Sequence, residues 1–190
     1  MGRLVVSEFV SLDAVMEDPG GAEGTPHGGW TMPYWNDEIA SFKQQELFEA
    51  GAMLLGRVTY QGFAAAWPAM TDEAGFADRM NGIAKYVATS TLDTLTWNNS
   101  TRLDGDVATA VAGLKARVPG NILVAGSATL VRALAKPGLV DEYRLVVYPV
   151  TLGDGKRLFG DGTFTKLNLT YEQRTSSGAL LLAFGVPPAA

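Results

Sequence analysis

The sequence predicts an α/β fold: a mixed, mostly parallel central sheet with helices on both faces. Strand and helix candidates alternate through the first two thirds of the chain, as in βα units with parallel pairing. Two strand candidates joined by Ser176-Ser-Gly178 then form an antiparallel hairpin near the C-terminus. With 190 residues, 47% of them hydrophobic, the chain can bury one core, and no linker divides it. We therefore expect one domain over residues 1–190.

The individual elements follow from hydrophobic patterns and their boundary residues. Asn36 or Asp37 is expected to cap one helix, and Asp104 or Asp106 another, since such side chains accept hydrogen bonds from first-turn N–H groups. Further helices are expected after Gly56, over 73–83 and over 127–135. The strands are expected at 4–12, 53–56, 84–89, 122–125, 143–150, 165–174 and 179–186.

Composition excludes several classes of function. The net charge of −5 argues against a nucleic-acid-binding surface. The chain has no cysteine, which rules out disulfides, a thiolate nucleophile and sulfur-ligated metals. Its one histidine, His27, lies in a Gly/Pro-rich loop over 17–36 without a second histidine at ligand spacing, so no metal site is expected. No run of about 18 apolar residues suggests a membrane segment, and we expect a cytoplasmic protein.

Two segments, 52–60 and 122–130, share one pattern: an apolar strand that reaches a glycine and continues into a helix. Such a turn gathers free N–H groups and a partial positive charge, which favours phosphate. The nearby side-chain donors are Arg57, Thr59, Ser127 and Thr129. Two such turns on one sheet fit a dinucleotide better than a mononucleotide. The alternative is that each turn serves packing alone.

Five segments also carry a family pattern. They are Ser11-Leu-Asp-Ala14, Leu54-Leu-Gly-Arg-Val-Thr-Tyr60, Ala88-Thr-Ser-Thr-Leu92, Val124-Ala-Gly-Ser-Ala-Thr-Leu130 and Pro149-Val-Thr-Leu-Gly-Asp-Gly-Lys-Arg-Leu-Phe159. In this order they resemble the dihydrofolate reductase-like superfamily, and more narrowly its bacterial branch related to the reductase domain of riboflavin biosynthesis. The resemblance implies a three-layer dihydrofolate reductase-like fold and an NADPH cofactor.

The resemblance also implies which residues bind the cofactor. Arg57 is expected to face the adenosine 2′-phosphate of NADPH, and an arginine there favours NADPH over NADH. Ser90 and Thr91 are expected at the same phosphate or at the adenine ribose. The whole expected cofactor-binding set is Gly56, Arg57, Thr59, Ser90, Thr91, Ala125, Gly126, Ser127, Ala128 and Thr129.

Carboxylates are the candidates for orienting or protonating a substrate. Asp13, at the end of the first strand, is our first choice of catalytic residue, and Glu38 is the second. Glu38 lies in a segment that resembles the Trp-x-x-Pro…acid segment of dihydrofolate reductases, although residues 36–38 could equally well only cap a helix. Asp13, Glu17 and Trp30 are expected to bind substrate, and the loop after Gly153 to border the substrate pocket.

These observations predict an NADPH-dependent reductase that transfers hydride to a small heteroaromatic substrate, pterin- or aminopyrimidinone-like. The alternative is a nucleotide-binding protein of the same fold without turnover, such as a sensor or a remnant. We also expect a homodimer, with much of its interface from residues 143–186, because residues 179–184 are apolar on both faces of a strand.

Overall fold

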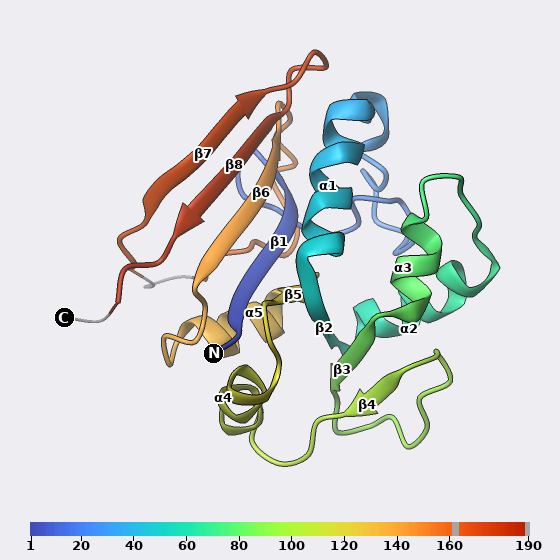
Figure 1. Cartoon of the computed structure of the whole chain (residues 1–190). Coiled ribbons are helices and arrows are strands. Elements are labelled where there is room, and N and C mark those ends of the chain that lie inside the picture. Colours follow the sequence, from blue (N-terminus) through green and yellow to red (C-terminus); the bar gives the residue numbers. More distant parts are fainter. Residues whose placement is uncertain (161–163, 189–190) are drawn as a thin grey trace.

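The computed structural model describes residues 1–160 and 164–188, which form an eight-stranded sheet with helices packed on it (Figure 1). The strand order is β4-β3-β2-β5-β1-β6-β8-β7. The strands are β1 (Arg3–Ser11), β2 (Ala50–Gly56), β3 (Ala84–Ala88), β4 (Ser100–Arg102), β5 (Asn121–Val124), β6 (Glu142–Tyr148), β7 (Asn168–Arg174) and β8 (Leu180–Gly185).

The sheet is mixed, as predicted. The first six strands in this spatial order, from β4 through β1 to β6, pair in parallel with their neighbours. Strand β8 pairs antiparallel with both β6 and β7. The predicted mostly parallel sheet with a C-terminal antiparallel hairpin is thus confirmed. Because the six parallel strands point the same way, their C-terminal ends meet at one edge, where ligands bind in open α/β sheets.

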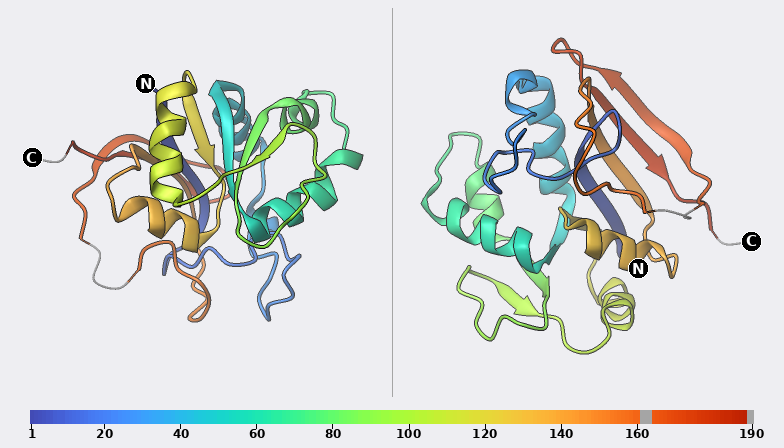
Figure 2. Two further views of the ribbon diagram at one scale, coloured as in Figure 1. Left: turned by 90° about the horizontal axis from the view of Figure 1, so that it is seen from below. Right: turned by 180° about the vertical axis from the view of Figure 1, so that it is seen from behind.

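Five α-helices connect these strands and cover both faces of the sheet (Figure 2). They are α1 (Asp37–Glu49), α2 (Arg57–Ala66), α3 (Phe76–Gly82), α4 (Val107–Arg117) and α5 (Ala128–Ala135). Side chains of α1, α2 and α3 pack on one face, and those of α4 and α5 on the other. Within the described ranges, no helix is both long and apolar enough to cross a membrane.

Side-chain caps fix where two of the helices begin, and one member of each predicted pair provides the cap. The Asn36 side chain accepts a hydrogen bond of 3.0 Å from the N–H of Ile39. Asp106 accepts one of 2.9 Å from the N–H of Thr109. Each satisfies an N–H that the first helical turn leaves unpaired, which stabilises the helix by about 1 kcal/mol.

Strand β1 lies between β5 and β6 and is covered on both faces. Leu4 and Val6 pack with the layer of α4 and α5, and Val5 packs with the layer of α1 to α3. The same strand carries Ser7 and Glu8, which are also buried. A buried polar residue on a central strand costs free energy unless it is paired, so these two residues need an explanation.

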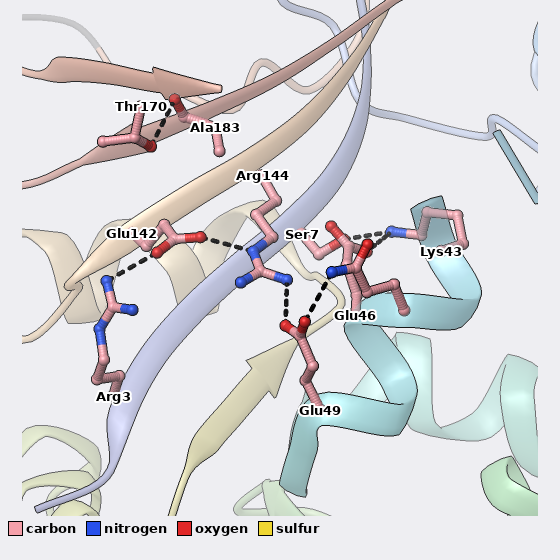
Figure 3. Close-up of polar contacts among 10 residues, drawn as sticks. Arg3, Ser7, Lys43, Glu46, Glu49, Glu142, Arg144, Thr170 and Ala183 are labelled. Carbon is pink, nitrogen blue, oxygen red and sulfur yellow. Dashed lines mark hydrogen bonds and ion pairs between the residues drawn. The ribbon is translucent and has the colours of Figure 1, made fainter. Parts of the chain in front are cut away.

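The contact between β1 and α1 explains Ser7 (Figure 3). Its hydroxyl donates a 2.6 Å hydrogen bond to Oε2 of Glu46, which also lies 2.7 Å from Nζ of Lys43. Beside this group, Arg144 of β6 forms ion pairs with Glu49 and Glu142. The charges of α1 are therefore matched against β1 and β6, which fixes how the helix lies across them.

Most strand bounds differ from the predicted ones by one to three residues, as in β2, which begins at Ala50 rather than at residue 53. Strand β4 was not predicted, because its three residues Ser100–Arg102 have no apolar pattern and are held by pairing with β3. Helix α3 begins at Phe76 rather than at residue 73, since Asp72 accepts hydrogen bonds from the N–H groups of Phe76 and Ala77. Strand β7 begins at Asn168 and its pairing shifts between Leu169 and Tyr171.

The C-terminal hairpin leaves apolar side chains in solvent. Every residue of the edge strand β7 is exposed. The exposed fractions are 51% for Leu169, 41% for Tyr171 and 39% for Leu180. An edge strand with exposed apolar side chains favours association.

We propose that a second copy of the chain covers this hairpin. Light scattering at tens of micromolar protein should give about twice the monomer mass of 20.2 kDa. Replacing Leu169 and Leu180 together with glutamate should give the monomer mass, because each charge would be desolvated in the interface. A monomer mass for the unmutated protein would contradict the proposal.

Candidate functional site

A cleft of about 470 Å³ opens at the C-terminal ends of β2, β3 and β5. It is lined by Gly56, Arg57, Val58, Ala88, Thr89, Ser90, Thr91, Leu103, Gly105, Val107, Ser127, Thr129, Leu130 and Ala133. We refer to it as the first cleft. Its position matches the edge where parallel sheets bind ligands, and its volume falls in the range typical of small-molecule sites.

The two strand–glycine–helix turns pack directly against each other at the base of this cleft. The N–H of Gly56 donates a 3.3 Å hydrogen bond to the carbonyl of Gly126. A Cβ at Gly56 would lie 2.8 Å from Oγ of Ser127, which is too close for any side chain. Gly126 has φ of +80°, a conformation that favours glycine, and a Cβ there would lie 3.0 Å from Oγ1 of Thr59.

Both helix N-termini at the cleft lack a side-chain cap. The N-cap residue of α2 is Gly56, which has no side chain, and that of α5 is Ser127, whose hydroxyl accepts no hydrogen bond from its helix. The first N–H groups of each helix are thus available to another acceptor. Together with the positive ends of the helix dipoles, they suit an anion.

The side chains of the first cleft also favour an anionic ligand. Among its lining residues Arg57 is the only charged one, and the others supply hydroxyls or apolar surface. Arg57 is exposed, and its Nη1 donates to Gln61 at 3.0 Å. The Thr89 hydroxyl is occupied, because it accepts from the N–H groups of Thr91 and Leu92.

The structure brings the predicted cofactor-binding residues together. Six of them line the first cleft: Gly56, Arg57, Ser90, Thr91, Ser127 and Thr129. The other four, Thr59, Ala125, Gly126 and Ala128, belong to the same two turns. Residues from three separate strand ends therefore meet around one cleft, while the binding of NADPH by them stays a prediction.

A second cleft, of about 370 Å³, lies beyond the ends of β1 and β6. It is lined by His27, Gly28, Trp30, Pro33, Tyr34, Val150, Thr151 and Leu152. Trp30 and Tyr34 make edge contacts with Tyr148, whose buried hydroxyl has no hydrogen-bond partner in the part of the chain that the structure describes. Burial raises the pKa of Tyr148, so this hydroxyl stays neutral.

The predicted substrate residues gather around the second cleft. Trp30 lines it, and its Nε1 donates a 2.9 Å hydrogen bond to the carbonyl of Glu17. The Glu17 carboxylate pairs with Lys156 in the loop after β6. Asp13 accepts from the N–H of Leu152, a lining residue, at 3.1 Å. Of the three residues predicted to bind substrate, Trp30 lines the cleft, and Asp13 and Glu17 each bind a lining residue. Their substrate-binding role stays a prediction.

Asp13 is held as a carboxylate. It accepts hydrogen bonds from the Ser11 hydroxyl at 2.6 Å and from the N–H of Gly153 at 2.8 Å. The Ser11 hydroxyl and these backbone donors lower the pKa of Asp13 to about 2. An acid of that strength holds almost no proton at neutral pH, so Asp13 suits positioning of the loop or of a substrate better than proton donation.

The Gly/Pro-rich loop beside the second cleft is organised by a buried carboxylate, Asp18. It accepts hydrogen bonds from the N–H groups of Glu23 at 2.9 Å and of Thr25 at 3.0 Å. A Cβ at Gly28 would lie 2.2 Å from Oδ2 of Asp18, so only glycine fits there. The loop therefore folds around Asp18, and this sets the position of Trp30 at the cleft.

Glu38 lies apart from both clefts. Its carboxylate accepts hydrogen bonds from the N–H of Ser176 at 2.7 Å and from the hydroxyl of Ser176 at 2.6 Å. The Ser176 hydroxyl lowers the pKa of Glu38. In this arrangement Glu38 joins the start of α1 to the β7–β8 turn. Nothing in its contacts favours the catalytic role that the sequence predicted for it.

Sequence reasoning missed a carboxyl group beside the Gly126 turn, that of Glu8. The residue is 8% exposed, and its buried Oε1 has no hydrogen-bond partner within residues 1–160 and 164–188. Burial raises the pKa of Glu8 from 4.5 to about 8, despite the opposing effects of Lys43 and of the Gly126 N–H. The available signal was a charged residue inside a buried strand of Val and Phe.

Gly126→Val should abolish dinucleotide binding while the protein stays folded. A valine side chain would collide with Thr59 and force the turn out of its positive φ. Calorimetry with NADPH would measure binding, and circular dichroism would check the fold. Gly62→Ala on the exposed side of α2 is the control, since a Cβ there meets nothing within 4 Å. Unchanged binding by a folded Gly126→Val variant would mean that the turn is only structural.

Glu8→Gln should change how stability depends on pH. Between pH 4.5 and about 8, native Glu8 keeps a proton that the unfolded chain releases, so the free energy of unfolding falls as pH rises. Each pKa unit is worth about 1.4 kcal/mol, and the glutamine variant should lack this loss. Urea unfolding at pH 5 and pH 8 measures it. Parallel pH profiles for the two proteins would show that Glu8 has an ordinary pKa.

Two solved structures have a fold similar to that of this chain. A protein named for riboflavin biosynthesis from Shewanella sp. PV-4 superposes with a TM-score of 0.70 at 15% identity, covering 97% of this chain and 99% of its own. A pyrimidine reductase-like protein from Corynebacterium diphtheriae gives a TM-score of 0.66 at 14% identity, covering 99% and 93%. At such identities the likeness concerns the fold, and it confirms the predicted dihydrofolate reductase-like architecture.

Two sequence relatives come from Bacillus subtilis (strain 168), and both are uncharacterized proteins. YyaP is 36% identical over 77 residues, which is 40% of each chain. YwjB is 32% identical over 118 residues, which is 62% of this chain and 63% of YwjB. The match thus spans less than two thirds of either relative.

The family comparison covers nearly the whole chain. The model of the RibD C-terminal domain matches residues 3–181, from the start of β1 into β8. The chain therefore belongs to the RibD C-terminal domain family, a reductase-like branch of the dihydrofolate reductase-like fold.

Proposed function

We propose that this protein is an NADPH-dependent reductase of a small heteroaromatic substrate, pterin- or aminopyrimidinone-like. The observation that carries the proposal is the first cleft, where two uncapped helix N-termini, hydroxyls and Arg57 converge. Reductase-like relatives of the same fold support it. A dinucleotide needs anion sites in line with apolar surface for a base, and the cleft offers both.

The residues present fit such a cofactor. The N–H groups of the Gly56 and Gly126 turns would hold the pyrophosphate, and the absence of a Cβ at both glycines leaves room for close approach. Arg57 would pair with the adenosine 2′-phosphate, beside Ser90 and Thr91. Leu103 and Val107 would pack against the adenine. When bound, NADPH supplies a hydride, and the protein orients it and excludes water.

The second cleft suits the substrate. Trp30 and Tyr34 provide aromatic surface for a flat ring, and Tyr148 leaves one neutral hydroxyl unsatisfied near them. Backbone groups of residues 150–152 add polar partners. A heteroaromatic ring would exploit both features, because its faces are apolar and its edge forms hydrogen bonds.

Turnover separates this proposal from its alternative, nucleotide binding without reaction. Steady oxidation of NADPH would be followed by absorbance with dihydrofolate or with 5-amino-6-(5-phosphoribosylamino)uracil as the second substrate. Oxidation that depends on either compound supports the reductase. NADPH binding without oxidation in the presence of both would favour the binding protein.

Arg57→Ala should erase most of the preference for NADPH over NADH. The bond between guanidinium and phosphate is worth about 1.5–3 kcal/mol, or roughly 10- to 100-fold in affinity, and NADH lacks that phosphate. Calorimetry of both dinucleotides with the unmutated protein, Arg57→Ala and the control Arg117→Ala measures the effect. Equal affinities of the unmutated protein for NADPH and NADH would rule out this role for Arg57.

A further inference from the structure

Strand β1, which carries Glu8, lies between β5, which ends near the first cleft, and β6, whose following residues line the second. On one side, Oε1 of Glu8 would be 3.8 Å from a Cβ built on Gly126, the turn at the base of the first cleft. On the other side, the strand continues for three residues to Ser11, which binds Asp13 beside the second cleft. Three residues of strand span about 10 Å. A molecule reaching from one cleft to the other would pass Glu8.

One oxygen of the Glu8 carboxyl group lacks a hydrogen bond within the described residues. Its Oε1 is buried and has no hydrogen-bond partner in the described residues, although a buried polar oxygen without a partner costs about 1–3 kcal/mol. A Cβ built on Gly126 would lie near both Oε1 of Glu8 and Oγ1 of Thr59, and Gly126 and Thr59 belong to the predicted cofactor site. An unsatisfied group facing a ligand site is paired once the ligand is bound, which would recover that cost.

The other carboxylates near the clefts already have hydrogen-bond or ion-pair partners. Asp13 accepts hydrogen bonds from one hydroxyl and two N–H groups. Glu17 pairs with Lys156, and Glu38 is bound by Ser176. Glu46 also has one unpaired buried oxygen, but its other oxygen is held by Ser7 and Lys43. For Glu8, the Gly126 N–H and the charge of Lys43 favour the ionised form, but burial outweighs them, and Oε1 has no partner among the described residues.

The charges around Glu8 come from α1. Lys43 favours the ionised form of Glu8, and Glu46, which pairs with Lys43 at 2.7 Å, disfavours it more weakly. Burial then dominates, and at neutral pH the carboxyl group is mostly protonated. A neutral carboxylic acid can donate its proton, whereas Asp13 at its low pKa cannot.

We propose that Glu8 is the catalytic acid of this site, contacting the heteroatom of the bound substrate and delivering a proton to it. The inference rests on the proposed reductase function. In the step, a hydride from reduced nicotinamide forms a C–H bond at the carbon of a C=N group, and the π electrons move to nitrogen. The nitrogen takes the proton of Glu8, which becomes a carboxylate beside oxidised nicotinamide and regains a proton from solvent after product release.

The test begins with the ligand-free protein. Carbon-13 NMR of glutamate carboxyl groups should show one resonance that titrates near pH 8 and is missing from Glu8→Gln. The glutamine has nearly the shape of the neutral acid, so this variant should fold. The exposed residue Glu73 provides the control variant Glu73→Gln, which should keep the resonance. A Glu8 resonance that titrates near pH 4.5 overturns the inference, whatever the protein's activity.

The second arm measures the reaction with the two probe substrates, dihydrofolate and 5-amino-6-(5-phosphoribosylamino)uracil. Glu8→Gln should bind NADPH within about twofold of the unmutated protein yet lose about 10²- to 10⁴-fold in single-turnover rate. Glu8→Asp should retain part of the rate and Glu73→Gln all of it. The rate of the unmutated protein should fall as the pH rises through 8.

The outcomes separate the two proposals. If the unmutated protein oxidises NADPH and Glu8→Gln does so at the same rate with the same pH profile, the role of Glu8 is overturned and the reductase stands. If the unmutated protein oxidises no NADPH with either probe, the result counts against the reductase itself and against any acid serving it.

Discussion

The direct contact between two glycine turns is the constraint on which the candidate site depends. Gly56 and Gly126 come from strands that are adjacent in the sheet but 70 positions apart in the chain, and a hydrogen bond joins them. Neither position has space for a Cβ, because Ser127 and Thr59 occupy it. This close approach merges two ordinary helix N-termini into one anion-favouring cleft. A side chain at either glycine would separate them, and the cleft would lose its base.

The two clefts along the sheet edge offer different chemical groups to a ligand. The first cleft, at β2, β3 and β5, offers N–H groups, hydroxyls and one arginine, which suits phosphates. The second, beyond β1 and β6, offers aromatic side chains, which suits a ring. Strand β1 joins them and is itself locked to α1 through Ser7, Glu46 and Lys43. A rigid strand between two clefts is a suitable support for hydride transfer, which requires fixed distances between donor and acceptor.

The features that could be predicted from the sequence are those that depend on residues close together in the chain. Helix caps at Asn36 and Asp106, the glycine turns and the C-terminal hairpin depend on a few neighbouring residues, and all were found. The role of Glu38 could not be judged, because its partner Ser176 lies 138 positions away. Glu8 was overlooked although it lies in an apolar strand, because its raised pKa depends on burial by segments distant in the chain. Strand β4 could not be predicted either, because it forms by pairing with β3 and has no hydrophobic pattern of its own.

We expect one ligand to span the first cleft and to end at Glu8. A crystal structure of the protein with NADP⁺ tests this most directly. We expect the 2′-phosphate beside Arg57, the pyrophosphate at the Gly56 and Gly126 turns, and the nicotinamide near Glu8. A dinucleotide bound elsewhere, or in the reverse orientation with the nicotinamide at Arg57, would contradict the account.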